Sequence, residues 1–403
     1  MMQPFLDEGL FYTKDVCFFY VIIMEDVFCC PLCGNTEPRY LGILNGKYYC
    51  RRCLSFRGKE AEKKMYLPQK INPKINYQLT EKQNEIAEKV TRNYQRKKNT
   101  LIYAVTGAGK TELVYQVIAH VLSKGLHVGF VIPRKDVVIE LSARFKKVFP
   151  QIDIAIVYGG HNEKLSGQLI ILTTHQLYRY PKYFDLLIFD EIDAFPYVDN
   201  ALLEKMFLRS VKGNYVLMSA TPSRKEIKTF KEEGNLLTLF ERFHQYPLPV
   251  PQIVIRFLGF EYVYLIKKCL EWKKAHKPFL IFVPVISQTK TVFRILEFFL
   301  QNGDYVHSQR KKRNEIITRF KKRNLSFLVT TSVLERGVTI ENLQVLIFNA
   351  HHVLFDSKTL IQISGRVGRK TKYPTGEIIF LANQKTPAMI EAIDDINRKN
   401  QVL

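Results

Sequence analysis

Two stretches of the sequence place glycines beside basic residues, a combination that suits phosphate binding. The first, residues 104–111, reads Ala-Val-Thr-Gly-Ala-Gly-Lys-Thr and overlaps the end of the apolar run 101–105. Glycines let a backbone curl so that its amides face an anion, and a helix that begins there adds its positive end. A loop of this kind between a strand and a helix predicts a nucleotide site. The backbone predicted to surround the phosphates belongs to Thr106, Gly107, Ala108 and Gly109.

Lys110 and Thr111 end this loop with the two side chains that a nucleotide site needs. The ammonium of Lys110 would contact the β- and γ-phosphates of ATP, and the Thr111 hydroxyl would hold Mg²⁺. The usual pattern opens with glycine, whereas Ala104 stands here at a strand end, where a positive φ is not required. A glycine-rich turn without a nucleotide is the alternative, and the intact Gly-Lys-Thr ending argues against it.

Asp190 and Glu191 follow the apolar run 186–189. Their carboxylates would therefore emerge at the carboxyl end of a strand, where the sites of parallel sheets lie. Asp190 would bind the metal through water, and Glu191 would orient and deprotonate the attacking water. Acidic residues after a strand are also common helix N-caps, but their place in chain order after the phosphate loop favours the catalytic interpretation.

The second phosphate-handling stretch, residues 362–369, contains Arg366 and Arg369. Three residues apart, they would lie on one face of a helix, from which both could reach a γ-phosphate. An arginine supplied in this way contributes roughly 10³ to 10⁵ in rate. A basic surface helix is the alternative, and it leaves Gln362, Gly365 and Gly368 without an explanation.

Four of the seven cysteines form two Cys-x2-Cys pairs separated by 16 residues. Paired thiolates on two tight turns can meet one tetrahedral Zn²⁺, so this spacing predicts a zinc ribbon. The predicted ligands are Cys30, Cys33, Cys50 and Cys53. Two disulfides or a redox-active pair are the alternatives, which a reducing compartment disfavours. Cys29 lies beside Cys30 and could replace it as a ligand.

The composition indicates a folded chain with a polyanionic partner. Hydrophobic residues make up 46% of the sequence, and 60 Lys and Arg against 38 Asp and Glu give a net charge of +22. Such an excess is typical of nucleic-acid binding, with a solubilising surface as the alternative. The apolar run 18–24 is too short to cross a bilayer, and no signal-peptide pattern opens the chain. We therefore expect a cytoplasmic protein.

From Tyr77 onward, short apolar runs alternate with segments of helical length, which predicts an α/β fold with parallel sheets. The strands expected in the first half are 101–105, 128–132, 154–158, 169–173, 186–189 and 215–218. Prolines at every second position from 247 to 251 then interrupt the pattern. It resumes with expected strands at 279–283, 327–331, 345–348 and 377–381.

This organisation predicts four parts. We expect a zinc-ribbon domain over residues 1–60, a basic linker over 61–76, and two α/β lobes over 77–247 and 248–403. Each lobe has the size of a typical domain, and the proline run would be the hinge between them.

Along the chain, the phosphate loop, the pair Asp190 and Glu191, and the stretch 362–369 follow one another in the order found in superfamily 2 helicases, which they resemble. In that superfamily, two RecA-like lobes enclose ATP. The resemblance covers residues 77 to about 381 and implies that Gln83, in the stretch 79–83, reads the adenine. The resemblance also implies that Gly337 is one of the residues that bind the nucleotide. The positions that match strand-contacting motifs are Pro133, Arg134, Thr173 and Thr174 in the first lobe and Thr331 in the second.

A narrower resemblance is to ComFA, the competence helicase family of Gram-positive bacteria. The four cysteines ahead of the motor and the stretches 105–112, 133–138 and 190–197 carry it. It implies an ATPase that single-stranded DNA stimulates, and a translocase that drives transforming DNA into the cytoplasm. It also implies ComFC and DprA as partners and a peripheral position at the inner face of the membrane, beside the DNA uptake channel. Self-association would suit such a motor, although no sequence signature marks it.

The resulting prediction is a four-cysteine zinc ribbon followed by two tandem RecA-like lobes, with ATP, Mg²⁺ and Zn²⁺ as cofactors. A PriA-like replication-restart helicase or an RNA helicase is the rival within the superfamily. PriA proteins resemble this chain less, because their cysteines lie in an insertion between the lobes. A non-catalytic DNA-binding scaffold is the rival from another class. Basic clusters at 310–313 and 321–323 add a candidate phosphate track, or else a solvated face.

Overall fold

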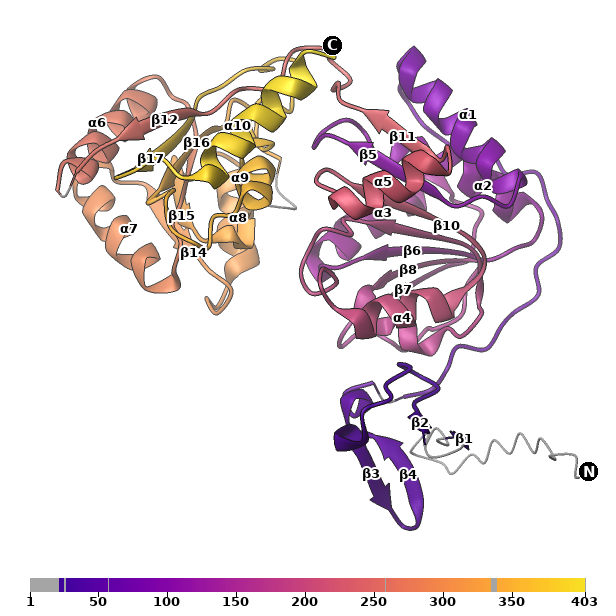
Figure 1. Cartoon of the computed structure of the whole chain (residues 1–403). Helices are drawn as coiled ribbons and strands as arrows, with labels where there is room; N and C mark the ends of the chain where they lie inside the picture. The colour runs from indigo at the N-terminus through magenta and orange to yellow at the C-terminus, as the bar shows by residue number, and fades with distance from the viewer. Residues whose placement is uncertain (1–21, 25–26, 57, 258, 335–338, 403) are drawn as a thin grey trace, which may run out of the picture. The chain divides into compact units, whose positions relative to one another are not determined.

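The computed structural model describes residues 22–24, 27–56, 58–257, 259–334 and 339–402. Within these residues it contains one sheet of seven strands, one of six, and two small hairpins (Figure 1). The prediction of two α/β lobes with parallel sheets is therefore confirmed.

The described chain divides into two compact units, and the limits between them pass through the seven-stranded sheet. The first contains the described parts of Met1–Gln78, Ala87–Leu101 and Val114–Met218. The second contains Leu79–Ile86, Ile102–Leu113 and the described part of Ser219–Leu403. The phosphate loop thus belongs to the same unit as the C-terminal half of the chain.

The seven-stranded sheet has the order β11-β5-β10-β9-β6-β8-β7. Its strands are β5 (Thr100–Ala104), β6 (Val128–Ile132), β7 (Ile154–Val157), β8 (Leu169–Thr173), β9 (Phe184–Asp190), β10 (Val211–Ser219) and β11 (Leu236–Leu239). Every residue of β6, β8 and β9 is buried, as expected for parallel strands covered on both faces. All six strands expected here form. Only β11 was missed, because this four-residue edge strand has one buried residue.

Five helices accompany this sheet: α1 (Glu81–Gln95), α2 (Tyr115–Ser123), α3 (Lys135–Val148), α4 (Ala201–Ser210) and α5 (Arg224–Glu232). The α-helix expected to begin at the phosphate loop starts only at Tyr115. One 3₁₀ turn, Glu112–Val114, comes first, as often happens at the start of an α-helix. The Tyr115 ring then packs edge-on against Phe145 and anchors the first residue of α2 in the core.

The six-stranded sheet has the order β12-β17-β16-β13-β15-β14, and all neighbours in it are parallel. Its strands are β12 (Gln252–Ile255), β13 (Phe279–Phe282), β14 (Gly303–Val306), β15 (Phe327–Thr330), β16 (Gln344–Phe348) and β17 (Ile378–Ala382). The four strands expected from apolar runs are its central ones. The missed strands, β12 and β14, are the two edges, whose side chains are mostly half-buried and give a weaker sequence signal.

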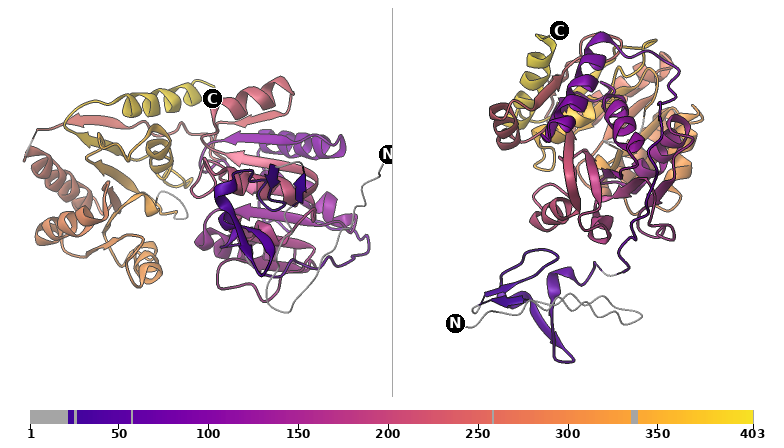
Figure 2. Two further views of the ribbon diagram at one scale, coloured as in Figure 1. Left: turned by 60° about the horizontal axis from the view of Figure 1, so that its bottom comes forward. Right: turned by 90° about the vertical axis from the view of Figure 1, so that its right-hand side faces the viewer.

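Helices cover both faces of this second sheet (Figures 1 and 2). They are α6 (Phe260–Lys274), α7 (Ile286–Leu300), α8 (Arg313–Lys321), α9 (Ser357–Ser364) and α10 (Pro387–Asn400). Buried residues of α6 and α7 share one core cluster with side chains from one sheet face. Those of α8, α9 and α10 share another cluster with side chains from the opposite face. The alternation of side chains along each strand produces this division.

The N-terminal part contains the hairpins β1–β2 (Ile22–Met24 and Val27–Cys29) and β3–β4 (Leu41–Leu44 and Lys47–Cys50). The segment expected as a linker follows without regular structure, but it is tied to the first unit. The Tyr66 hydroxyl donates to Asp153 at 2.7 Å, and the Gln69 amide donates to the Ser123 carbonyl at 3.0 Å. Among the described residues, no helix has both the length and the apolar character that crossing a membrane requires.

The start of β14 provides a test of packing in the second sheet. A Cβ atom on Gly303 would overlap the ring of Phe327, which is fully buried and stacked on Phe279 with centroids 5.4 Å apart. Because that ring cannot move freely, we expect Gly303→Ala to lower the free energy of unfolding by about 1–3 kcal/mol. Thermal denaturation followed by circular dichroism measures this. The control is Gly159→Ala, whose added Cβ meets no heavy atom within 4 Å; equal melting of the two variants would refute the packing argument.

Candidate functional site

The phosphate loop leaves β5 at Ala104 and turns through two glycines. Gly107 has a φ of 86° and Gly109 a φ of 83°, a region that side-chain-bearing residues rarely adopt. A Cβ on Gly109 would also lie 2.7 Å from the Gln83 amide nitrogen. This backbone therefore requires both glycines, in agreement with the predicted phosphate loop.

Lys110 and Thr111 complete the loop. The Lys110 ammonium donates to the carbonyl of Ala104 at 3.3 Å, so the side chain folds back over the loop. Thr111 is buried, with 8% of its surface exposed. Both side chains lie where the sequence predicted them, at the end of the curled backbone, and the loop has the residues that would hold a triphosphate and its Mg²⁺.

Gln83, in the first turn of α1, connects that helix to the phosphate loop. Its amide nitrogen donates to the Ala108 carbonyl at 2.8 Å, and its amide oxygen accepts from the Thr80 backbone at 2.9 Å. The side chain is 4% exposed. The structure thus places Gln83 against the loop, and both ends of its amide already have protein partners.

Arg366 and Arg369 do not lie on a helix, so that expectation was wrong. Helix α9 ends at Ser364 with Gly365 as its C-cap, and Gly368 has a φ of 69°. The backbone after Ser364 therefore continues as a turn, and the positive φ of Gly368 lies within it. Arg366 is 2% exposed, and the Arg369 Nε donates to the Gly365 carbonyl at 2.7 Å. We call residues 365–369 the arginine turn.

The second unit brings the arginine turn to the phosphate loop. The Thr106 hydroxyl donates to the Gly365 carbonyl at 3.1 Å. A Cβ on Gly365 would overlap that hydroxyl, so glycine allows the approach. The Cγ of Arg369 would lie 3.7 Å from a Cβ on Gly107. The two phosphate-handling stretches, far apart in sequence, are therefore in contact.

Arg242, which was not among the predicted site residues, also joins these two segments. Its guanidinium donates to the Thr106 carbonyl at 3.1 Å, the Gly365 carbonyl at 3.2 Å and the Val367 carbonyl at 2.6 Å. Burial, with the charge of Arg369 as a smaller cause, lowers the pKa of Arg242 to about 9. The residue is isolated between β11 and the proline run, so no motif could have identified it.

In the first unit, other predicted residues meet at one edge of the parallel strands. Ile132 at the end of β6 pairs with Thr173 at the end of β8, so Pro133 and Arg134 follow beside Thr174. Val131 pairs with Phe189 of β9, which places Asp190 at the same edge. Asp190 thus lies at the carboxyl end of its strand, as expected, and the residues that follow β6 and β8 lie at the same edge.

Asp190 and Glu191 have a constrained backbone at this edge. Asp190 is 8% exposed, and its Oδ1 accepts from the Glu191 amide at 2.9 Å. Glu191 has a φ of 61°, an uncommon conformation for a residue with a side chain. Such a conformation persists only where its surroundings hold it, and it is frequent at functional sites.

Three predicted residues have less accessible or undescribed positions. Thr174 is fully buried, and its hydroxyl oxygen has no hydrogen-bond partner among the residues that the structure describes. Thr331 follows β15 and is 9% exposed. Gly337 lies outside the described residues.

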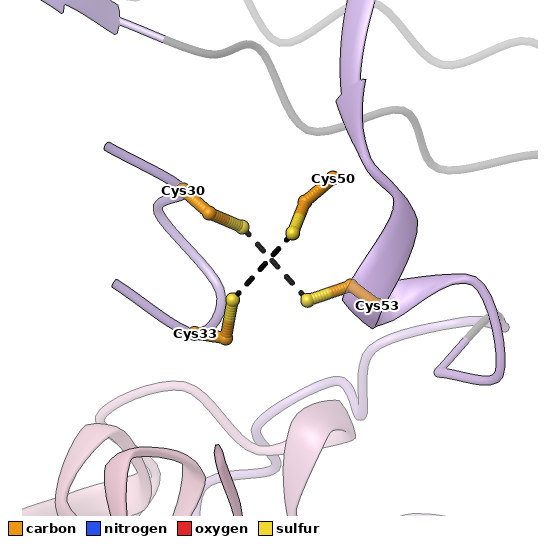
Figure 3. A group of neighbouring side chains, drawn as sticks. All are labelled: Cys30, Cys33, Cys50 and Cys53. Carbon is orange, nitrogen blue, oxygen red and sulfur yellow. Dashed lines mark hydrogen bonds between the residues drawn. The ribbon is translucent and has the colours of Figure 1, made fainter. Parts of the chain in front are cut away.

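The four predicted cysteine ligands converge on one point (Figure 3). All four sulfurs lie within 4.8 Å of one another, with 3.8 Å between those of Cys30 and Cys53 and 3.7 Å between those of Cys33 and Cys50. A tetrahedral ion with bonds of about 2.3 Å to sulfur requires sulfurs about 3.8 Å apart. A disulfide requires about 2.05 Å. The donor set therefore fits Zn²⁺ and not two disulfides.

The protonation of these thiols also fits a cation. Hydrogen bonds from Cys33 and Cys53 lower the pKa of Cys30 to about 2, while the hydrogen bond with Cys30 raises the pKa of Cys33 to about 12 and raises that of Cys53 as well. Four clustered thiols cannot all ionise alone. A divalent ion would let all four bind as thiolates.

The segment that follows the zinc ribbon packs against other residues of the first unit. The Phe56 ring stacks on His175 with centroids 6.1 Å apart and 14° between the ring planes. Arg179 donates to the Lys59 carbonyl at 2.8 Å. Because His175 follows Thr174, the ribbon is packed against the segment predicted to contact a nucleic-acid strand.

The basic clusters in the C-terminal half are partly engaged within the protein. Arg310 forms an ion pair with Asp304 at 2.8 Å, and its guanidinium lies 3.5 Å from the centroid of the Tyr305 ring. Arg323 donates to the Glu341 carbonyl at 2.6 Å. These contacts fix two of the cations that were candidates for a phosphate track.

Comparison with known protein families supports the helicase interpretation. Residues 76–224 match the family described as Type III restriction enzyme, res subunit. Residues 261–371 match the Helicase conserved C-terminal domain. The two matches contain the phosphate loop and the arginine turn respectively.

Two relatives match along almost the whole chain. Competence protein ComFA of Streptococcus pneumoniae is 37% identical over 395 residues, covering 92% of this chain and 90% of that protein. Competence protein ComFA of Bacillus subtilis is 33% identical over 397 residues, covering 93% and 86%. Among solved structures, S. cerevisiae Dbp5 bound to RNA and ADP BeF3 has a TM-score of 0.61 at 15% identity, covering 81% of this chain and 88% of that one. At this identity, the likeness shows the fold alone.

The cysteine geometry predicts a measurable metal content. The purified full-length chain should hold about one zinc ion, and Cys33→Ser should remove most of it, because a structural site needs all four ligands. Inductively coupled plasma mass spectrometry of the two proteins measures this. Cys29→Ser is the matched control, since Cys29 is exposed and outside the cluster. Loss of zinc from the Cys29 variant, with retention in the Cys33 variant, would contradict the assigned ligand set.

Proposed function

Because the chain belongs to the ComFA family of competence proteins and matches the restriction-enzyme res subunit and helicase C-terminal families, we propose that it is an ATP-driven translocase on single-stranded DNA that serves DNA uptake. The contact between the phosphate loop and the arginine turn is the observation that carries this proposal. It joins the nucleotide-binding segment to the segment that would respond to the nucleotide.

The nucleotide would bind at the curled backbone of residues 106–109. Lys110 would bind its terminal phosphates, and the Thr111 hydroxyl and Asp190 would hold Mg²⁺, which neutralises charge on the phosphates. Glu191 would orient and deprotonate the attacking water. Gln83 would contact the adenine, and its hydrogen bond to Ala108 would make the loop sensitive to that contact.

Arg366 and Arg369 would sense the γ-phosphate. The hydrogen bonds from Thr106 and Arg242 to the backbone of the arginine turn support this role, because they make the position of the turn depend on that of the loop. Arginines placed in this way stabilise the charge that develops during phosphoryl transfer. Hydrolysis would then alter the contact and couple chemistry to movement.

One DNA strand would bind at the carboxyl ends of the parallel strands. Pro133, Arg134, Thr173 and Thr174 would provide the contacts in the N-terminal half, and Thr331 the contact in the C-terminal half. Contacts to phosphates carry no sequence information, which suits a motor that must advance over any DNA. The charge of +22 supports a polyanionic track.

The proposed setting is the cytoplasmic side of the DNA uptake channel, with a peripheral position at the membrane. ComFC and DprA would be the protein partners, and several copies would act together on one strand. The stacking of Phe56 on His175 supports a role of the ribbon in holding the strand-contacting segment in place.

ATP hydrolysis tests the proposal. We expect single-stranded DNA to stimulate phosphate release more than RNA or forked DNA does. Lys110→Ala should weaken nucleotide binding, and Glu191→Gln should reduce kcat by about 10²–10⁴-fold while ATP stays bound, because it removes the base. Malachite-green phosphate release and filter binding of labelled ATP measure the two effects.

Two exposed residues provide matched controls, Lys124→Ala and Glu88→Gln. Normal turnover in either site variant would contradict its assigned role. Stronger stimulation by RNA would favour an RNA helicase, and stronger stimulation by forked DNA a PriA-like function. No hydrolysis under any condition would favour the non-catalytic scaffold.

A further inference from the structure

Helices α6 and α7 lie side by side over one face of the six-stranded sheet (Figures 1 and 2). Their inward residues are fully packed: Leu265, Cys269 and Trp272 of α6 and Val292, Leu296 and Leu300 of α7 are each at most 1% exposed. These residues account for how the two helices fold against the sheet.

The outward face of α6 is apolar as well. Phe260, Val263 and Leu270 are 68%, 61% and 42% exposed. Their spacing of three and seven residues places them in one row along the helix. At the end of α7, Phe298 is 82% and Phe299 48% exposed, and their rings meet edge-on with centroids 5.0 Å apart. An exposed apolar surface of this extent usually marks an interaction site.

Val263, Leu270 and Phe299 of this surface border a shallow groove. It has a volume of about 520 Å³ and is widely open to solvent. Its lining consists of Val263, Ile266, Leu270 and Phe299 with the polar residues Lys267, Glu271 and Lys274. Apolar side chains thus form the floor and charged ones the rim.

The rim has an excess of positive charge. Glu271 forms an ion pair with Lys268 at 3.0 Å, and Lys268 also binds Glu377 at 2.6 Å. Within the described chain, no carboxylate lies within 4.0 Å of the ammonium of Lys267 or Lys274. Lys267 and Lys274, which form no ion pair within the described residues, therefore border the apolar groove.

We propose that the α6–α7 groove is a docking site for an amphipathic helix of a partner protein, with acidic residues beside its apolar row. A helix in a groove buries a row of apolar anchors at three- and four-residue spacing, and the apolar lining along α6 with Phe299 of α7 can receive such a row. Acidic flanks would complement Lys267 and Lys274. The apolar floor does not suit a phosphate backbone.

This inference does not depend on the proposed translocase activity. The arginine turn follows α9, which packs on the opposite face of the same sheet. A partner on α6 and α7 would therefore leave the phosphate-handling residues uncovered.

Fluorescence anisotropy with the full-length chain tests the proposal. The probes are two labelled helical peptides with leucines at positions i, i+3, i+4 and i+7, flanked by glutamates in one peptide and by lysines in the other. The wild-type chain should bind the acidic peptide at least tenfold more tightly than the basic one. The double variant Lys267→Glu, Lys274→Glu should reverse this preference, and Val263→Asp should weaken both peptides about tenfold, since it places a charge in the floor.

Lys290→Glu is the matched control, because this exposed lysine lies on α7 outside the groove lining. Unchanged melting temperatures would show that the variants are folded. Failure of the wild-type chain to bind the acidic peptide would overturn the proposal. So would equal binding by all variants, or a dimer in sedimentation that Val263→Asp dissociates, which would make the groove a contact between copies. Loss of DNA affinity in the Val263 variant with unchanged peptide binding would assign the surface to nucleic acid.

Discussion

The backbone carbonyls of the arginine turn impose the main constraint on the nucleotide site. A helix end leaves carbonyls that need donors, and a buried one without a donor costs about 1–3 kcal/mol. Here the donors are the Thr106 hydroxyl and the Arg242 guanidinium, both of which also belong to the surroundings of the phosphate loop. The hydrogen bonds that end α9 are thus the ones that fix the loop against the turn. If the phosphate loop moves away from the arginine turn, these hydrogen bonds break. A change at one segment is therefore transmitted to the other.

The sequence predicts those parts of this site whose conformation is set by residues close together in the chain. The central strands follow from apolar runs, because a strand buried on both faces must be apolar throughout. The curl of the phosphate loop follows from Gly107 and Gly109, whose positive φ values require glycine. The edge strands β11, β12 and β14 were missed because half-buried strands carry no such run. Arg366 and Arg369 were wrongly placed on a helix, since the spacing of two arginines does not reveal that Gly365 ends it. Arg242 could not be found, because its function depends on carbonyls that lie far away in sequence.

In the zinc ribbon, too, the features set by nearby residues could be predicted, and the contacts between residues far apart in sequence could not. Its ligands could be named from spacing alone, because each Cys-x2-Cys pair is set by one tight turn. What the spacing could not reveal is the stacking of Phe56 on His175 and the hydrogen bond from Arg179 to Lys59. Those contacts place the ribbon's exit segment against residues 174–179, next to Thr173 and Thr174. A domain that sequence presents as a separate module is in this way part of the surface that is proposed to hold the strand.

Helices α6 and α8 differ in the exposure of their apolar residues, and the difference shows that packing on the sheet does not explain the apolar outer face of α6. Both helices cover the six-stranded sheet, and a helix in that position needs one apolar side. In α8 the apolar residues are Ile316, Ile317 and Phe320, and all are buried or half-buried. In α6 a second apolar row faces solvent, opposite the one that packs on the sheet. Folding accounts for the inner row in both helices, and the proposed partner helix would account for the outer row of α6.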